Sequence, residues 1–255
     1  MLRFNNAVVC LLCLFIAVPA MADFYGGKAD YSQKYATGQG GEFRLEPHSD
    51  GFYLSNSAYA DSTRNQELSG SFQTFCLEVT EYIHDDSHIK VSTTYKDGTA
   101  PGSHAYKGST GTGDDLNPET AWLYTQFATG NLDGYNYGSG GYKSLSRAQT
   151  AGSLQRLIWS LEEEGGGTDW GVDLSSYYGI DINNDQRQLI FIWETAYVQS
   201  GGWSGIGNVR VLQLYENSDY TGFRQDQLYL TPVPGAFLLG LLGLGAAGMK
   251  LRKFA

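Results

Sequence analysis

Short segments that alternate hydrophobic and polar residues occur toward both ends of the chain, and this period of two is typical of β-strands with one buried face. These segments are also rich in β-branched and aromatic side chains, which favour strands. We therefore expect strands over residues 41–46, 71–83, 88–95, 208–215 and 226–231.

The middle of the chain has hydrophobic residues at helical spacing instead. Asn117 before Pro118 is typical of a helix start and predicts a helix that runs through Ala128. Two further helices are expected over residues 144–164, closed by Gly165 as a C-terminal cap, and over residues 184–199. Strands at both ends with helices between them predict an α+β fold.

The N-terminal segment has the composition of a secretory signal peptide. Arg3 provides a positive charge, residues 7–18 are apolar, and an Ala-Met-Ala cleavage pattern ends at Ala22. We expect cleavage between Ala22 and Asp23. A membrane-spanning helix is the alternative, but the apolar run is too short and ends in a processing site.

The C-terminal segment combines a proline motif, a glycine-rich apolar run and a basic end: Pro232, Val233, Pro234 and Gly235, then residues 236–249, then Lys250, Arg252 and Lys253. It resembles a PEP-CTERM sorting signal, with Val233 where the usual motif has Glu. The resemblance implies an exosortase-type membrane protease as processing partner. A C-terminal anchor that stays uncut is the alternative, and the membrane is otherwise not an expected partner.

These signals divide the chain into residues 1–22, a domain over residues 23–231 and a sorting or anchor segment over residues 232–255. We expect the domain to be a β-rich scaffold, either a sandwich or a barrel, with a helical subdomain inserted at about residues 117–200. Without its ends the chain keeps 13 of its 17 Lys and Arg residues and all 27 Asp and Glu, so its net charge is near −14. Such an acidic surface argues against nucleic-acid binding.

Removal of the signal peptide would leave one cysteine, Cys76, in an exported domain. An unpaired cysteine in such a domain suggests intermolecular pairing or a reactive thiol. On a strand, Cys76 would share a face with Thr74 and Glu78. A small buried hydrophobe is the alternative reading of this residue.

A glutamine in the expected middle helix provides a candidate partner. Ala151, Gln155 and Trp159 follow at i, i+4 spacing, and Gly152 leaves room for another backbone to approach. A glutamine on the flank of a helix that faces the core needs a hydrogen-bonding partner.

Together, Phe75-Cys76-Leu77-Glu78 and Leu154-Gln155-Arg156-Leu157-Ile158 resemble the two motifs of thioester domains of bacterial surface adhesins. The resemblance implies an internal thioester between Cys76 and Gln155, formed with loss of ammonia. A target amine or hydroxyl would then attack the acyl carbon and remain covalently bound through Gln155. It implies single-turnover capture by a protein of the cell surface or extracellular matrix, with no cofactor and no enzymatic turnover.

Three other patterns are weaker. Residues 181–185 begin like a calcium loop, but Gln186 and Ile192 replace its glycine and glutamate, so helix capping explains them better. Residues 84–88, with two histidines and two aspartates, are expected to form a polar turn rather than a metal site. Residues 162–164, three glutamates, are expected to be a solvated charge run.

Two other functions remain open at this stage. The first is a non-reactive structural or carbohydrate-binding matrix protein, since the chain has 18 Tyr, 12 Phe and 5 Trp that could pack a core or stack on sugars. The second is a glycoside hydrolase, which would need a cleft with paired carboxylates.

Overall fold

The fold was determined as a computed structural model, which describes residues 25–37, 40–48, 71–79, 81–91, 104–105, 114–138, 140–162 and 182–230. All of them belong to one compact unit, Phe24–Pro232. The expected signal peptide and the expected sorting segment lie outside the described residues.

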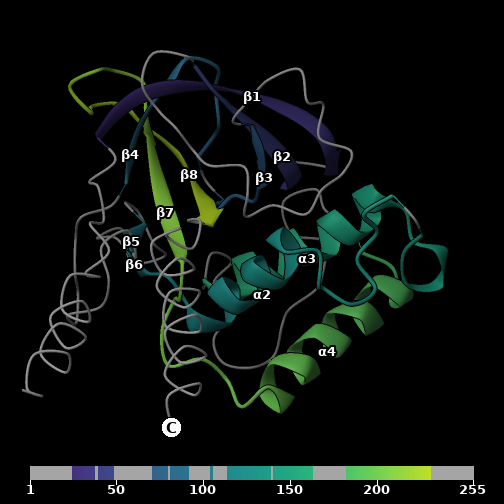
Figure 1. Cartoon of the computed structure of the whole chain (residues 1–255). Coiled ribbons are helices and arrows are strands. Elements are labelled where there is room, and N and C mark those ends of the chain that lie inside the picture. Colours follow the sequence, from purple (N-terminus) through teal and green to yellow (C-terminus); the bar gives the residue numbers. More distant parts are fainter. Residues whose placement is uncertain are drawn as a thin grey trace, which may run out of the picture. The chain divides into compact units, whose positions relative to one another are not determined.

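The centre of the fold is an antiparallel sheet in the order β3-β2-β1-β4-β7-β8 (Figure 1). Its strands are β1 (Tyr25–Thr37), β2 (Gly40–Pro47), β3 (Phe72–Thr74), β4 (Ser87–Val91), β7 (Val209–Tyr215) and β8 (Phe223–Leu230). A separate pair consists of β5 (His104–Ala105) and β6 (Asp114–Asp115). The sequence-based expectation of a β-rich α+β fold is confirmed at this level.

The strand β1 was not expected from the sequence. It has two glycines and few β-branched residues, so its local composition does not favour a strand. It forms because β2 pairs with one of its edges and β4 with the other. A bulge between Ser32 and Tyr35 interrupts the first pairing. Tertiary pairing therefore overrides weak local preference here.

The prediction of one continuous strand over residues 71–83 was wrong. Only Phe72–Thr74 pair with β2, and the chain then leaves this ladder. The next residues pair with the opposite edge of the sheet: the Leu228 N–H donates to the Phe75 carbonyl at 3.2 Å, and the Leu77 N–H to the Asp226 carbonyl at 3.1 Å. The sheet therefore curls until its two edges meet, and we call this junction of residues 75–77 with residues 226–228 the seam.

The described residues between β6 and β7 form the helices α2 (Pro118–Ala128), α3 (Arg147–Leu161) and α4 (Asn184–Gln199). A short 3-10 helix, η2 (Tyr142–Ser144), precedes α3. The expected caps are present at Asn117, whose side chain accepts from the Glu119 N–H, and at Asn183, which accepts from the Gln186 N–H. The prediction that Gly165 caps the C-terminus of α3 was wrong. The helix ends at Leu161, and Glu162 is its C-terminal cap.

Two of the helices, α2 and α3, pack on the sheet, and α4 packs on these two helices. The helix α3 contacts β1 and β2, α2 contacts β7 and β8, and α4 packs against α2 and α3 (Figure 1). Ten successive residues of α3, Thr150 to Trp159, are buried, because this helix has the sheet on one side and α4 on the other. The core thus runs between the sheet and α3, which places the middle of α3 beneath the sheet.

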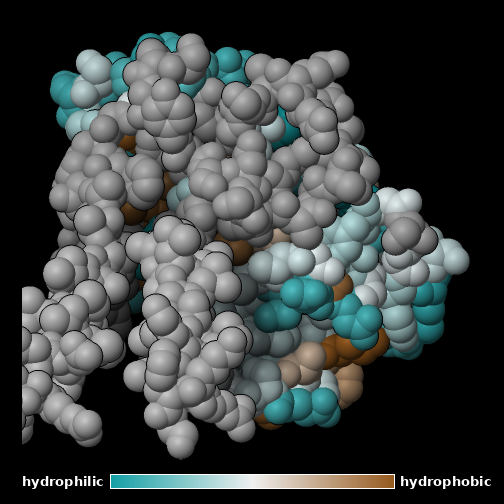
Figure 2. Space-filling view, in the orientation of Figure 1, coloured by the Kyte–Doolittle hydropathy of each residue, from teal (hydrophilic) through white to brown (hydrophobic). Residues whose placement is uncertain are grey.

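The helix α4 is less buried than α3 and keeps two large apolar side chains in solvent. Phe191 is 69% exposed and Val198 is 65% exposed. Figure 2 shows brown, hydrophobic surface on the part of the molecule that carries α4. None of the helices in the described part of the chain is both long enough and apolar enough to cross a bilayer.

Candidate functional site

Cys76 lies in the seam, where the backbone itself fixes its position. It forms an isolated antiparallel bridge with Gln227 of β8. The Thr74 hydroxyl donates to the Leu228 carbonyl at 2.7 Å, and the Tyr124 hydroxyl of α2 donates to the same oxygen at 3.0 Å. The Cys76 side chain is completely buried. The thiol is therefore held on a backbone segment that is tied to both β8 and α2.

Gln155 of α3 meets this segment from the helical side. Its Nε2 donates to the Cys76 carbonyl at 2.8 Å, and its Oε1 accepts the Cys76 N–H at 3.1 Å. Gln155 is also completely buried. These two reciprocal hydrogen bonds satisfy the side-chain amide of Gln155 and both backbone polar groups of Cys76. The structure thus brings together the two residues that the sequence analysis paired, although 79 positions separate them in the chain.

The thiol of Cys76 is strongly affected by its surroundings. Burial raises the pKa of Cys76 far above its ordinary value, and the charge of Glu78 raises it further. The one opposing influence is the hydrogen bond that Gln227 Nε2 donates to Cys76 Sγ at 3.3 Å. The resting group is therefore a protonated thiol, and a thiolate forms here only transiently.

Two buried carboxyl groups lie beside the seam. Glu78 and Asp226 are each 1% exposed, and Glu78 Oε2 accepts the Asp226 N–H at 2.7 Å. Asp226 Oδ1 accepts the Leu214 N–H at 3.2 Å, which ties it to β7. Burial raises the pKa of Glu78 well above its ordinary value, and the neighbouring Asp226 charge raises it further. Glu78 consequently holds its proton at pH values where ordinary glutamates are ionised.

Aromatic rings surround the seam on the helical side. Phe75 is completely buried and packs edge-on against Phe127 of α2, with 4.9 Å between ring centroids. Trp159, one turn after Gln155 in α3, is 3% exposed, whereas Trp122 packs against Tyr197 of α4. Phe75, next to Cys76 in the chain, and Trp159 keep bulk water out of this part of the core.

The arrangement supplies two elements of acyl transfer to a sulfur atom. The Cys76 N–H already donates to Gln155 Oε1, the oxygen on which negative charge would develop during attack at Gln155 Cδ. The Cys76 carbonyl holds Gln155 Nε2, the nitrogen that would leave. Both contacts orient the amide before any reaction begins.

Sequence reasoning missed Gln227 as a neighbour of Cys76 and Asp226 as a neighbour of Leu77 and Glu78. Both stand in the expected strand over residues 226–231, and the run of polar residues Arg-Gln-Asp-Gln in β8 was the available signal. These contacts depend on closure of the sheet edges, which no local pattern encodes.

The other sequence patterns have structural roles where the structure describes them. Asn183 caps α4, while Asp181 lies outside the described residues. Asp85 and Asp86 form a bend in which the Asp86 N–H donates to Asp30 Oδ1, while Ser87 and His88 already belong to β4. Within the described ranges no three His, Cys, Asp or Glu side chains are grouped to hold a metal ion.

The expectation of a solvated charge run was wrong for Glu162. This residue is 6% exposed, and its carboxylate accepts the Asn117 N–H at 3.2 Å, so it joins the end of α3 to the start of α2. The signal-cleavage residues Ala22 and Asp23 lie outside the described part of the chain. The same is true of the sorting-signal residues Pro232, Val233, Pro234, Gly235, Lys250, Arg252 and Lys253.

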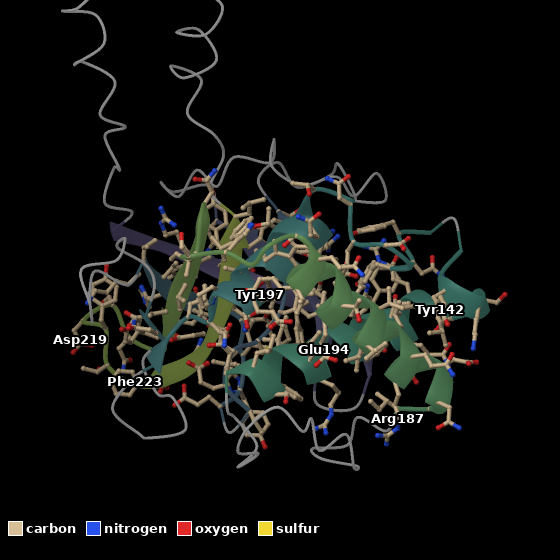
Figure 3. The ribbon with its side chains drawn as sticks, turned by 90° about the horizontal axis from the view of Figure 1, so that it is seen from below. Tyr142, Arg187, Glu194, Tyr197, Asp219 and Phe223 are labelled. Atoms are coloured by element: carbon tan, nitrogen blue, oxygen red, sulfur yellow. The ribbon has the colours of Figure 1, made fainter. Side chains whose placement is uncertain are left out.

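A second pair of carboxyl groups, Glu119 of α2 and Glu194 of α4, lies where these two helices pack together. Glu119 is 6% exposed, and burial together with the charge of Glu194 raises its pKa to about 7. Burial also raises the pKa of Glu194. Figure 3 labels Glu194 and Tyr197 on α4, and Tyr197 packs edge-on against Trp122 of α2. Burial in this contact between two helices explains the raised pKa values of both carboxyl groups without a catalytic role.

Comparisons of the chain with protein families, with curated proteins and with solved structures found no match.

Proposed function

We propose that the domain carries an internal thioester between Cys76 and Gln155 and uses it to attach covalently to a target that bears an amine or a hydroxyl. On this proposal the protein is a binding protein and not an enzyme, since each domain would react once and keep its target covalently bound. The meeting of the sheet edges at the seam favours the barrel form of the scaffold over the sandwich.

The observation that carries the proposal is the pair of reciprocal hydrogen bonds between the Gln155 side chain and the Cys76 backbone. A buried glutamine could find many partners in a core of this size. Here it meets the backbone of the one cysteine in the described residues, with both side chains shielded from solvent. That placement supports a thioester between Cys76 and Gln155.

Formation of the thioester would proceed by attack of Cys76 Sγ on Gln155 Cδ. The S–C bond forms, the C–N bond to Nε2 breaks, and the thiol proton passes to the leaving nitrogen, which departs as ammonia. The Cys76 N–H stabilises the charge on Oε1 during this step. The high pKa of the thiol slows its ionisation, while exclusion of water protects the product from hydrolysis.

In the capture step, the sulfur of Cys76 becomes the leaving group instead of the nucleophile. The nitrogen or oxygen of the target attacks Gln155 Cδ, the C–S bond breaks, and the proton lost by the target passes to Sγ. Cys76 returns to the thiol, and the target is joined to Gln155 through an amide or an ester. Because the site is buried, the seam must open locally before a large target can reach the acyl carbon.

Export and sorting are part of the same proposal. We infer a signal peptide over residues 1–22 and a C-terminal segment over residues 232–255 that an exosortase-type protease processes. The protein would act at the cell surface or in the extracellular matrix, anchored to the membrane transiently or permanently by its C-terminal segment. The acidic domain agrees with a location outside the cell and with a target other than nucleic acid.

The test is the intact mass of the purified mature protein, before and after incubation with methylamine. We expect a mass lower by one ammonia, then a gain of one methylamine located on Gln155 by peptide mapping. Cys76→Ala and Gln155→Ala should each abolish the initial mass deficit. Gln225→Ala, a control at another buried glutamine, should retain it.

A full predicted mass, with an intact Gln155 amide and a titratable Cys76 after unfolding, would refute the thioester. The alternative function is then a non-reactive structural or carbohydrate-binding matrix protein. The observation that favours this alternative is the complete burial of a protonated thiol, which is common for cysteines that serve only in packing.

A further inference from the structure

The side chain that contacts the sulfur of Cys76 is Gln227. Its Nε2 donates to Cys76 Sγ at 3.3 Å, whereas the hydrogen bonds of Gln155 go to the backbone N–H and carbonyl of Cys76. Two glutamine amides therefore surround this cysteine from opposite sides, one from α3 and one from β8. The Gln227 amide donates to the sulfur of Cys76 and the Gln155 amide bonds to its backbone, which implies different roles for the two glutamines.

The seam fixes Gln227 in this position. The residue is directly opposite Cys76 in the antiparallel bridge, and the hydrogen bonds of Leu77 and Leu228 flank that bridge on both sides. Gln227 is completely buried, and its Nε2 also donates to the Gln225 carbonyl at 3.3 Å. Its amide is thus oriented by two contacts and has little freedom to turn away from the sulfur.

The oxygen end of the same amide is unusual. Gln227 Oε1 is buried and has no hydrogen-bond partner among the described residues. A buried amide oxygen without a partner costs folding free energy, and an apolar side chain of similar size would avoid this cost. Packing alone therefore does not account for a glutamine at this position, but a donor aimed at the sulfur does.

We propose that Gln227 is a catalytic residue of the thioester, a role that rests on the function proposed above. Its Nε2–H stabilises negative charge on Cys76 Sγ at the two moments when that charge develops. The first is loss of the thiol proton as Sγ attacks Gln155 Cδ. The second is departure of Sγ as the target attacks the same carbon and the C–S bond breaks.

Gln227 acts on the transition states more than on the resting states. In the thiol and in the closed thioester the sulfur is uncharged, and a hydrogen bond to it is weak. As charge accumulates on sulfur the same N–H becomes a charge-assisted donor, which is a stronger interaction. An interaction that strengthens only on the way to the transition state accelerates the reaction.

The test compares Gln227→Leu with Gln225→Leu in the purified mature protein. Gln225 is a matched control because it is a buried glutamine of β8, two residues away, whose Nε2 donates to the Glu78 carbonyl rather than to the sulfur. We expect Gln227→Leu to slow opening of the thioester by methylamine by about tenfold or more, the loss typical of a hydrogen bond to a charged group. Gln225→Leu should open at the wild-type rate.

A second readout separates catalysis from packing. Loosening of the seam would admit water and accelerate hydrolysis of the thioester, whereas loss of leaving-group stabilisation slows hydrolysis and methylamine opening alike. We expect both reactions to slow in Gln227→Leu. Gln227→Asn shortens the side chain and withdraws the donor from Sγ, so it should show the same slowing even if the leucine variant does not fold.

The outcomes distinguish this inference from the proposed function. A wild-type protein without the mass deficit refutes both. A wild-type protein with the deficit, combined with unchanged opening rates in the folded Gln227 variants, overturns the role of Gln227 alone. Faster hydrolysis in those variants also overturns it and assigns Gln227 to packing.

Discussion

At the residue scale, buried polar side chains in this protein find partners that are far away in the sequence. Gln155 pairs with Cys76, and the indole N–H of Trp193 donates to the Asp133 carbonyl at 2.7 Å, across 60 positions. Each contact satisfies a polar group that would otherwise destabilise the core. Such pairs specify one arrangement of helices on the sheet, because other arrangements leave the same groups without partners.

Glu119 should make stability depend on pH. Its pKa is about 7 in the folded protein, above its ordinary value of 4.5, so the folded state binds the proton more tightly than the unfolded state. Stability is therefore greatest below about pH 4.5 as far as this group is concerned, and it falls as the pH rises toward 7. We expect Glu119→Gln to remove this decline.

The measurement is the difference in Tm between Glu119→Gln and wild type at about pH 5 and about pH 8, which should be larger at the higher pH. Glu216→Gln, at an exposed position in the turn between β7 and β8, serves as control and should show no such change. An equal difference at both pH values would contradict the role assigned to Glu119.

At the element scale, the loop after α2 and the helix α4 pack closely enough to require glycine. Gly134 has φ +72°, and a Cβ atom there would lie 2.8 Å from Leu189 Cδ1 and 3.1 Å from Tyr142 Cβ. Gly201, which follows α4, has φ +87°, with no atom within 4 Å of its Cβ position. At both positions an L-residue would strain the backbone, but the two positions differ in packing.

Alanine substitutions at these glycines should separate the two effects. We expect Gly201→Ala to lower the free energy of unfolding by about 1 kcal/mol, the cost of a left-handed backbone for an L-residue. Gly134→Ala should cost about 2–4 kcal/mol, because overpacking against α4 adds to that strain. Urea unfolding measures both values. Equal losses would mean that α4 moves aside at no cost.

At the scale of the whole domain, a buried ion pair joins the sheet to the helices. Arg147, the first residue of α3, donates from Nη2 to Glu42 Oε1 of β2 at 2.6 Å and from Nε to Oε2 at 2.9 Å. The Tyr135 hydroxyl donates to Glu42 Oε2 at 2.6 Å, and the Arg147 guanidinium lies 4.3 Å from the centroid of the Tyr35 ring. Two side chains from different segments, Arg147 and Tyr135, thus converge on one carboxylate.

Breaking this pair should destabilise the domain more than replacing it. We expect Glu42→Leu and Arg147→Met each to lower the free energy of unfolding by about 3–5 kcal/mol, since each leaves an uncompensated buried charge. The double variant Glu42→Leu/Arg147→Met should lose less than the sum of the two single losses. Chemical denaturation of the four proteins tests this. Single losses below about 1 kcal/mol would be those of a surface pair and would contradict the assignment.

Local patterns predicted the elements whose start or period is encoded locally, and failed where strand pairing decides the structure. Asn117-Pro118 and Asn183 marked the starts of α2 and α4, because capping chemistry is local. The strand β1 was missed because its pairing partners, rather than its composition, make it a strand. The segment after Thr74 was predicted as a continuous strand because its alternation persists, although its pairing partner changes there.

The sequence by itself determined the α+β class and the positions of the helices and most strands. These follow from periodicity and from capping residues, which act within a few positions. The pairing of Cys76 with Gln155 was an expectation implied by the resemblance of two short motifs to those of thioester domains. Only the tertiary structure decided that the sheet edges meet at Cys76, that Gln155 reaches its backbone from α3, and that Gln227 reaches its sulfur from β8. The physical reason is that these contacts depend on sheet closure and helix packing, which join segments 79 and 151 positions apart.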